Sequence, residues 1–176
     1  MLIDLHVHTH HSHGCTLVPR EVLRRARETG LDGVVFTGSK DVGLRMFKAF
    51  SSRWVKPCLT ELGGKNACIV AESADLDAAA EGVTRSAWGL QNQKCSACSR
   101  VYVHQRVAEP FVAKLLERTR AISIGDPTRR DVNFGPVINE NAVATYERAV
   151  AMGRREGSIL IGGERLREGA LAKGYY

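Results

Sequence analysis

Aromatic residues are scarce in this chain of 176 residues, at 6% of the total. Long apolar stretches are missing as well: the longest, such as residues 34–36 and 159–161, are far shorter than the roughly 20 residues that cross a bilayer as a helix. The sequence therefore predicts no membrane contact and a core built mainly of aliphatic side chains and alanine. With 44% hydrophobic and 25% charged residues, the composition is that of a soluble globular protein.

Basic residues exceed acidic ones, which gives a net charge of +6, but no run of five or more basic residues occurs. A protein that binds single-stranded nucleic acid needs aromatic side chains among its basic ones, on which the bases stack. This sequence has no such alternation. We therefore predict a solvated basic surface and no nucleic-acid partner.

Disulfide-like spacing and a secretory signal are also missing, and the five cysteines are an odd number. Cys95 and Cys98 form a Cys-x-x-Cys pair, but no second pair follows at the distance of a zinc finger. The cysteine pattern predicts a reduced, cytoplasmic protein.

Helical and strand periodicities alternate along the chain, which predicts an α/β fold with parallel strands. The first strand, helix and second strand form one strand–helix–strand unit, in which proline opens the helix and Gly30 caps it. The predicted strands span residues 2–7, 31–37, 66–71, 100–104 and 158–161, and the predicted helices span residues 19–27, 41–50, 75–88, 110–120 and 142–156.

Three short motifs follow one another in the central part of the chain. They read FTGS at residues 36–39, ELGGKN at residues 61–66 and QKCS at residues 93–96. Each alone is weak, because a glycine turn, a glutamate before glycines and a single cysteine are common in unrelated proteins. Together, with Cys95 lying 34 residues after Glu61, they resemble the NAD(P)-dependent aldehyde dehydrogenases. The longer string QKCSACSR at residues 93–100 is similar to that of the 1-pyrroline-5-carboxylate dehydrogenases, which oxidise L-glutamate γ-semialdehyde.

The resemblance implies that Cys95 is the nucleophile and Glu61 the base. A cysteine thiolate attacks an aldehyde to form a thiohemiacetal, hydride loss leaves a thioester, and a base activates the water that hydrolyses it. The cofactor would be NAD, although the sequence does not separate NAD from NADP. The resemblance further implies cofactor contacts at Gly38, Ser39, Gly43 and Leu62, and a contact between Ser96 and the substrate carboxylate.

Two departures from the family pattern stand out. Asn92 occupies a position where the family commonly has glycine. The resemblance covers residues 36–176, which corresponds to a central part of the family's domain, so we expect an incomplete catalytic core with exposed apolar surface. Such a surface predicts self-association into a homo-oligomer.

The N-terminal string DLHVHT at residues 4–9 resembles the opening motif of the PHP metallohydrolases. Alternate residues of a strand share a face, so His6 and His8 form half of a site for a divalent metal. We therefore expect a PHP-like fragment over residues 1–37 and an aldehyde dehydrogenase-like fragment over residues 38–176. Two alternatives to the dehydrogenase hypothesis follow: a metal-dependent phosphoesterase that uses His6 and His8, and a fusion fragment without catalysis.

Overall fold

The computed structural model describes residues 3–4, 19–52 and 54–176. It divides into two compact units. The first unit contains Met1–Lys65 and Lys94–Ser96, and the second contains Asn66–Gln93 and Ala97–Tyr176. Each unit has its own parallel strands and its own helices, which confirms the predicted α/β class with parallel strands.

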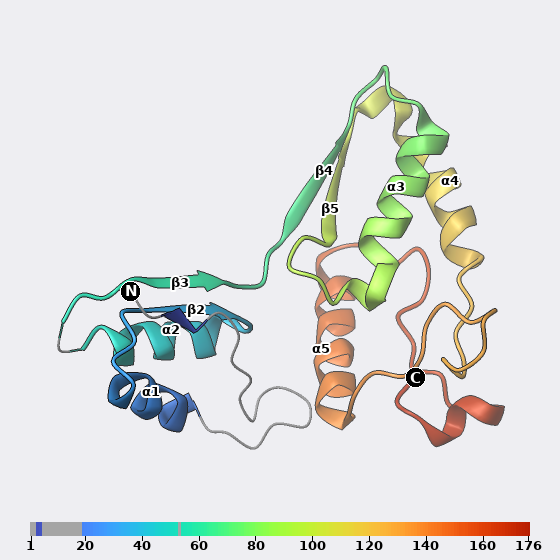
Figure 1. Cartoon of the computed structure of the whole chain (residues 1–176). Helices are drawn as coiled ribbons and strands as arrows, with labels where there is room; N and C mark the ends of the chain where they lie inside the picture. Colours follow the sequence, from blue (N-terminus) through green and yellow to red (C-terminus); the bar gives the residue numbers. More distant parts are fainter. Residues whose placement is uncertain (1–2, 5–18, 53) are drawn as a thin grey trace. The chain divides into compact units, whose positions relative to one another are not determined.

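The first unit is built on a three-stranded sheet in the order β1-β2-β3 (Figure 1). Its strands are β1 (Ile3–Asp4), β2 (Gly33–Thr37) and β3 (Cys58–Glu61), and both pairings are parallel. The parallel pairing of β1 with β2 confirms the predicted strand–helix–strand unit. Strand β3 is not among the predicted strands, because its four residues are too few to show a recognisable strand pattern. It forms because it pairs with β2.

Two helices belong to this sheet. Helix α1 (Pro19–Glu28) is followed by Gly30, whose φ of 71° places it in the left-handed region that the predicted cap requires. Helix α2 (Lys40–Phe50) supplies most of a hydrophobic core, in which Phe36 of β2 packs with the buried side chains of the helix. That core also includes the half-buried Leu62, so α2 lies against the chain that follows β3.

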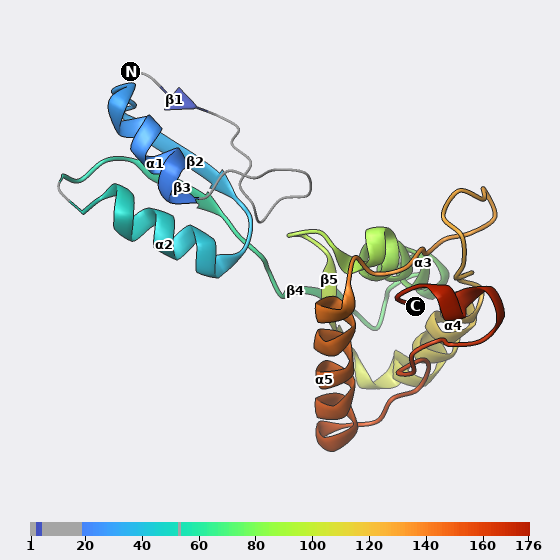
Figure 2. The ribbon, with the colours of Figure 1, turned by 90° about the horizontal axis from the view of Figure 1, so that it is seen from below.

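The second unit pairs two parallel strands, β4 (Asn66–Val70) and β5 (Cys98–Val103). Helices α3 (Leu76–Trp88) and α4 (Ala108–Arg120) pack against each other and cover one face of this pair, as Figures 1 and 2 show. The core there is formed by Val70, Ala80, Val83 and Phe111. The 3-10 turns η1 (Gly89–Asn92) and η2 (Gln105–Val107) flank β5.

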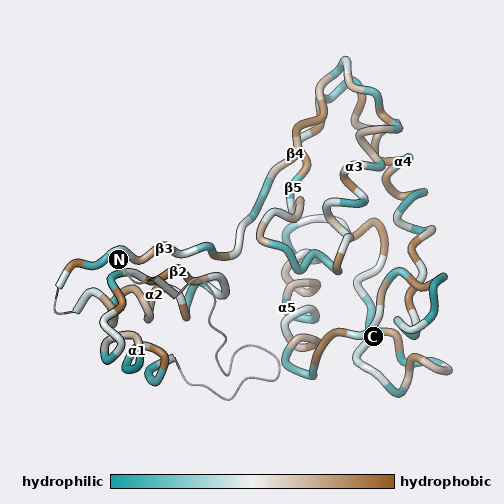
Figure 3. Tube along the Cα trace, in the orientation of Figure 1, coloured by the Kyte–Doolittle hydropathy of each residue, from teal (hydrophilic) through white to brown (hydrophobic). Residues whose placement is uncertain are grey.

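The other face of the β4–β5 pair carries exposed apolar side chains, and Figure 3 shows hydrophobic colour in the part of both strands nearest to the starts of α3 and α4 and hydrophilic colour at their opposite ends. Ile69 and Tyr102 are cross-strand neighbours on it, with exposed fractions of 79% and 57%. The expected exposed apolar surface is thus confirmed for the described residues. The predicted aliphatic and alanine core is confirmed as well, since alanine and valine make up most of the buried hydrophobic residues, with three phenylalanines among them.

The C-terminal part of the second unit contains helix α5 (Glu140–Glu156) and the turn η3 (Gly169–Lys173). The strand predicted over residues 158–161 is wrong: the segment is irregular and pairs with no strand in the described part of the chain. An apolar sequence becomes a strand only where a neighbouring strand satisfies its backbone groups. No helix in the described ranges is both long and apolar enough to cross a membrane.

Candidate active site

Glu61 is the last residue of β3, and its partner in the parallel ladder is Thr37 at the end of β2. The backbone N–H of Gly38 donates to the carbonyl oxygen of Glu61 over 3.1 Å. The turn that leaves β2 is therefore tied to the main chain of Glu61. Side chains alternate along β3: Cys58 and Thr60 are half-buried, Glu61 is exposed, and Cys58 packs against the core that α2 supplies. The carboxylate of Glu61 is thus available to solvent and to a reacting group.

Gly38 and Ser39 form the exposed turn between β2 and α2. Gly38 has no room for a side chain, because a β-carbon there would lie 2.6 Å from the ring of Phe36. Ser39 caps α2, and its hydroxyl accepts from the N–H of Val42 at 3.4 Å. The exposed start of an eleven-residue helix suits a phosphate group, because unpaired N–H groups and the helix dipole both favour an anion there. The residues present therefore fit the phosphate end of a dinucleotide.

Gly43 lies inside the unit, in contact with Leu62. A β-carbon on Gly43 would lie 2.6 Å from Leu62 Cδ2 and 3.5 Å from the ring of Phe36. The structure thus brings two of the predicted cofactor residues together, and Gly43 lets α2 approach the residue that follows Glu61. The sequence gives no sign of this packing role, because the contact with Leu62 forms only when the chain folds.

Cys95 and Ser96 lie in an exposed turn between η1 and β5, followed by the buried residues Ala97 and Cys98. Cys98 is held by its backbone N–H, which donates to Ser86 Oγ over 3.1 Å, and by its thiol, which contacts the carbonyl of Arg100 at 3.4 Å. The two cysteines therefore have different environments. Cys95 is exposed and can meet a substrate, whereas Cys98 is a small buried residue.

Residues 94–96 group with the first unit, so Cys95 and Ser96 belong to the same compact unit as Glu61, Leu62 and Gly43. The backbone on either side of them belongs to the second unit. An exposed thiol and an exposed carboxylate in one unit are the groups that nucleophilic attack and activation of water require.

Comparison with known proteins identifies the family. A model of the aldehyde dehydrogenase family matches residues 21–176. The chain belongs to the aldehyde dehydrogenase family. The sequence predicts that the dehydrogenase-like fragment begins at residue 38, but the family match begins at residue 21. Residues 21–37 of the predicted PHP-like fragment therefore lie within the family match.

Two curated aldehyde dehydrogenases illustrate the similarity. The α-ketoglutaric semialdehyde dehydrogenase of Bacillus subtilis is 45% identical over 152 residues, which cover 86% of this chain and 31% of that protein. The 1-pyrroline-5-carboxylate dehydrogenase of Bacillus mycoides is 39% identical over 136 residues, which cover 74% of this chain and 26% of that protein. The chain thus spans about three-tenths of the length of these relatives.

Solved structures agree with this assignment. The 1-pyrroline-5-carboxylate dehydrogenase from Thermus with bound NAD superposes with a TM-score of 0.72 at 40% identity, covering 81% of this chain and 28% of that one. A 3,6-anhydro-L-galactose dehydrogenase in complex with NAP gives a TM-score of 0.78 at 34% identity, covering 82% of this chain and 30% of that one. The described fold is therefore part of the aldehyde dehydrogenase fold.

The predicted metal ligands His6 and His8 lie outside the described residues. Within residues 3–4, 19–52 and 54–176, no three His, Cys, Asp or Glu side chains gather as a metal site would require. The family match begins after both histidines, so the aldehyde dehydrogenase assignment does not include them.

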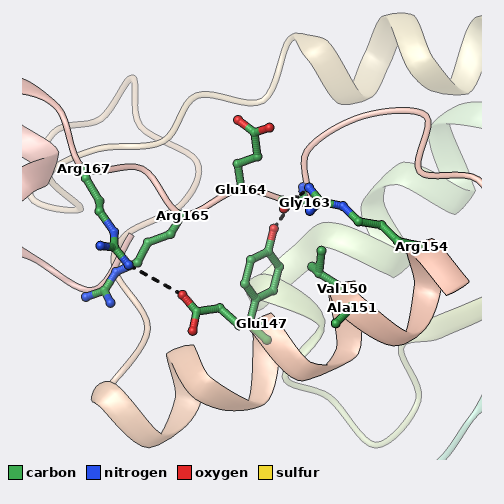
Figure 4. A pocket seen from close by; sticks show the side chains of 9 residues that line it. Glu147, Val150, Ala151, Arg154, Gly163, Glu164, Arg165 and Arg167 are labelled. Carbon is green, nitrogen blue, oxygen red and sulfur yellow. Dashed lines mark hydrogen bonds and ion pairs between the residues drawn. The ribbon is translucent and has the colours of Figure 1, made fainter.

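A pocket of about 390 Å³ lies in the second unit between α5 and residues 163–167 (Figure 4). Two of its arginines already have carboxylate partners: Arg165 pairs with Glu140 at 3.0 Å and Arg167 pairs with Glu147 at 3.7 Å. The described residues that line this pocket include none from the three motifs. The pocket is therefore separate from the residues that the family assignment makes candidates for catalysis.

Proposed function

We propose that this chain carries the nucleophile and the base of an NAD-dependent dehydrogenase that oxidises a carboxylate-bearing semialdehyde, with L-glutamate γ-semialdehyde as its substrate. The observation that carries the proposal is the exposed Cys95, placed in the same compact unit as the exposed Glu61. The names of the relatives support the substrate class, because both describe enzymes of small aldehydes or imines that carry a carboxylate.

In the proposed reaction the thiolate of Cys95 attacks the aldehyde carbon and forms a tetrahedral thiohemiacetal. When bound, NAD accepts the hydride that leaves this carbon. The product is a thioester on Cys95. Glu61 then takes a proton from water, the hydroxide attacks the thioester carbon, and the carbon–sulfur bond breaks, which releases the carboxylic acid and leaves Cys95 as the thiolate.

The remaining motif residues have positioning roles in this proposal. The exposed turn of Gly38 and Ser39 would hold the phosphates of the dinucleotide at the start of α2. Leu62, held by its contact with Gly43, would present its main chain to the nicotinamide. Ser96, next to the nucleophile and exposed, would donate its hydroxyl to the carboxylate of the substrate.

The nucleophile is tested first in a reaction that needs no cofactor. Incubation with p-nitrophenyl acetate is expected to acetylate Cys95, which peptide mass spectrometry locates. Cys95→Ser should lose the modification. Cys58→Ser is the matched control, because burial raises the pKa of the Cys58 thiol and leaves little of its reactive thiolate. Acetylation spread evenly over the described cysteines would contradict the assignment of Cys95.

The redox reaction is tested by absorbance of the reduced cofactor with NAD and L-glutamate γ-semialdehyde. Turnover that disappears in Cys95→Ser supports the dehydrogenase, and turnover that survives in this variant refutes the proposed mechanism. The substrate is tested by measuring kcat/KM for both L-glutamate γ-semialdehyde and α-ketoglutaric semialdehyde. A higher kcat/KM for α-ketoglutaric semialdehyde would make that aldehyde the substrate.

A further inference from the structure

The turn that leads into Cys95 has an unusual backbone. Leu90, Gln91 and Asn92 have φ values of 52°, 55° and 63°, and they are the non-glycine residues of the described chain with positive φ. Side chains disfavour this left-handed region, where asparagine is tolerated best after glycine. Three such residues in a row need compensating interactions. The last of them, Asn92, lies three residues before Cys95.

The side chain of Asn92 supplies two of these interactions. Its Nδ2 donates to the carbonyl oxygen of Ala87 over 2.8 Å and to the carbonyl oxygen of Cys98 over 3.0 Å. Ala87 lies in the last turn of α3, and Cys98 is the first residue of β5. One amide group therefore joins the element before the nucleophile loop to the element after it.

The loop between these points consists of residues 93–97, with Cys95 at its centre. Gln91 adds a third tie, since its Nε2 donates to the carbonyl oxygen of Gly135 over 2.6 Å. We propose that Asn92 is a positioning residue for the reaction: its amide clamps both ends of the 93–97 loop and so fixes the direction in which the Cys95 thiol is presented. The role in catalysis rests on the proposed function, in which Cys95 is the nucleophile.

The chemistry of the clamp makes it specific for asparagine. Both partners are carbonyl oxygens, which accept hydrogen bonds and cannot donate them, so only an NH2 group joins the two. An aspartate of the same shape would place negative charge against both oxygens. Glycine would adopt the φ of 63° without strain but would leave both carbonyls without the amide. Asn92→Gly therefore removes the two side-chain hydrogen bonds while it allows the same backbone conformation.

The first measurement is hydrogen exchange, which does not depend on activity. In Asn92→Gly the amides of residues 93–98 should exchange about tenfold faster, which corresponds to the loss of two partly buried hydrogen bonds at roughly 0.7 kcal/mol each. The exchange in the first two turns of α3 should stay as it is. Unchanged exchange over residues 93–98 would overturn the clamp, whatever the activity of the protein.

The second measurement concerns positioning. Acetylation of Cys95 by p-nitrophenyl acetate passes through an oriented tetrahedral state, whereas alkylation by iodoacetamide needs only an accessible thiolate. Asn92→Gly should lower the acetylation rate about tenfold and change the alkylation rate less than twofold, with the pH profile of alkylation unmoved. Equal losses in both rates, or a loss in neither, would contradict a positioning role.

Asn139→Gly is the matched control. It removes one asparagine side-chain bond, from the N–H of Ala142 to Asn139 Oδ1 at 3.0 Å, at the start of α5. This variant should lower the melting temperature without changing either rate at Cys95. If the parent protein is not acetylated at Cys95, the proposed function fails, and the exchange measurement still decides whether Asn92 clamps the loop.

Discussion

Gly43 and Leu62 approach each other so closely that a β-carbon on Gly43 would lie 2.6 Å from Leu62 Cδ2. This contact joins the buried face of α2 to the residue that follows Glu61. Gly43, a residue of the proposed cofactor region, therefore determines how near α2 comes to the chain that follows the proposed base. The relationship leads directly to a test.

Gly43→Ala should change the free energy of unfolding in opposite directions in two backgrounds. In the parent, the gain of about 1 kcal/mol from replacing glycine in a helix is offset by about 1–3 kcal/mol of overpacking against Leu62. In the Leu62→Ala background the space is open, and Gly43→Ala should stabilise by about 1 kcal/mol. Urea unfolding of the four proteins of this cycle measures the coupling, and additive effects would disprove the contact.

Glu61→Gln should separate the two halves of the proposed reaction. The amide cannot take a proton from water, so Cys95 should still be acetylated by p-nitrophenyl acetate while hydrolysis of the thioester slows by about 100-fold or more. A burst of one p-nitrophenolate per active Cys95, followed by a slow steady rate, is the expected signal. Asp41→Asn, which removes another exposed carboxylate of the same unit, should keep the steady rate. A steady rate unaffected by Glu61→Gln would exclude it as the base.

Asp75→Ala should destabilise the second unit by about 1 kcal/mol, because Asp75 caps α3. Its Oδ1 accepts from the N–H groups of Asp77 and Ala78 at 3.0 and 3.1 Å. Asp75→Ser keeps an acceptor at this position and should retain most of the stability. Denaturant unfolding compares the three proteins, and equal stabilities of Asp75→Ala and Asp75→Ser would show that the cap contributes nothing.

Glu21 should titrate far below its ordinary range. Hydrogen bonds from Arg24 and then Arg25 lower the pKa of Glu21 from 4.5 to about 2. The folded pKa is depressed, so these contacts stabilise α1 above pH 4.5 and are lost as the pH falls from 4.5 towards 2. NMR titration of the Glu21 carboxyl carbon measures the value. Because Arg24 and Arg25 are exposed, 1 M salt should raise the pKa of Glu21 towards 4.5, and a salt-independent value would contradict the assignment to these ion pairs.

Ile69→Lys should weaken the predicted self-association. Ile69 and its neighbour Tyr102 are exposed on the face of the β4–β5 pair that α3 and α4 do not cover, and desolvation of such a surface favours association. A lysine there would have to bury its charge in an apolar contact. Sedimentation velocity over a range of concentrations compares the variant with the parent, and Glu109→Lys adds the same residue at an exposed site on α4 as a control. A monomeric parent would remove the prediction altogether.

Much of the fold followed from local chemistry. Proline at the start of α1, glycine at its end and the periodic apolar residues of α3 and α5 predicted these helices within a few residues of their observed bounds. Strands were less certain, because a strand needs a partner. Strand β3 forms because it pairs with β2, whereas residues 158–161 are more apolar and remain irregular, since they pair with no strand in the described residues.

The sequence by itself determined the family and the candidate residues, because Glu61, Cys95 and the glycine motifs are read from residue type and spacing. Only the tertiary structure decided which of these residues touch. The contact of Gly43 with Leu62 and the bonds from Asn92 to Ala87 and Cys98 depend on backbone conformations and on segments that meet after folding. The sequence shows that asparagine stands at position 92, but only the folded chain brings two carbonyl oxygens within reach of its side-chain amide.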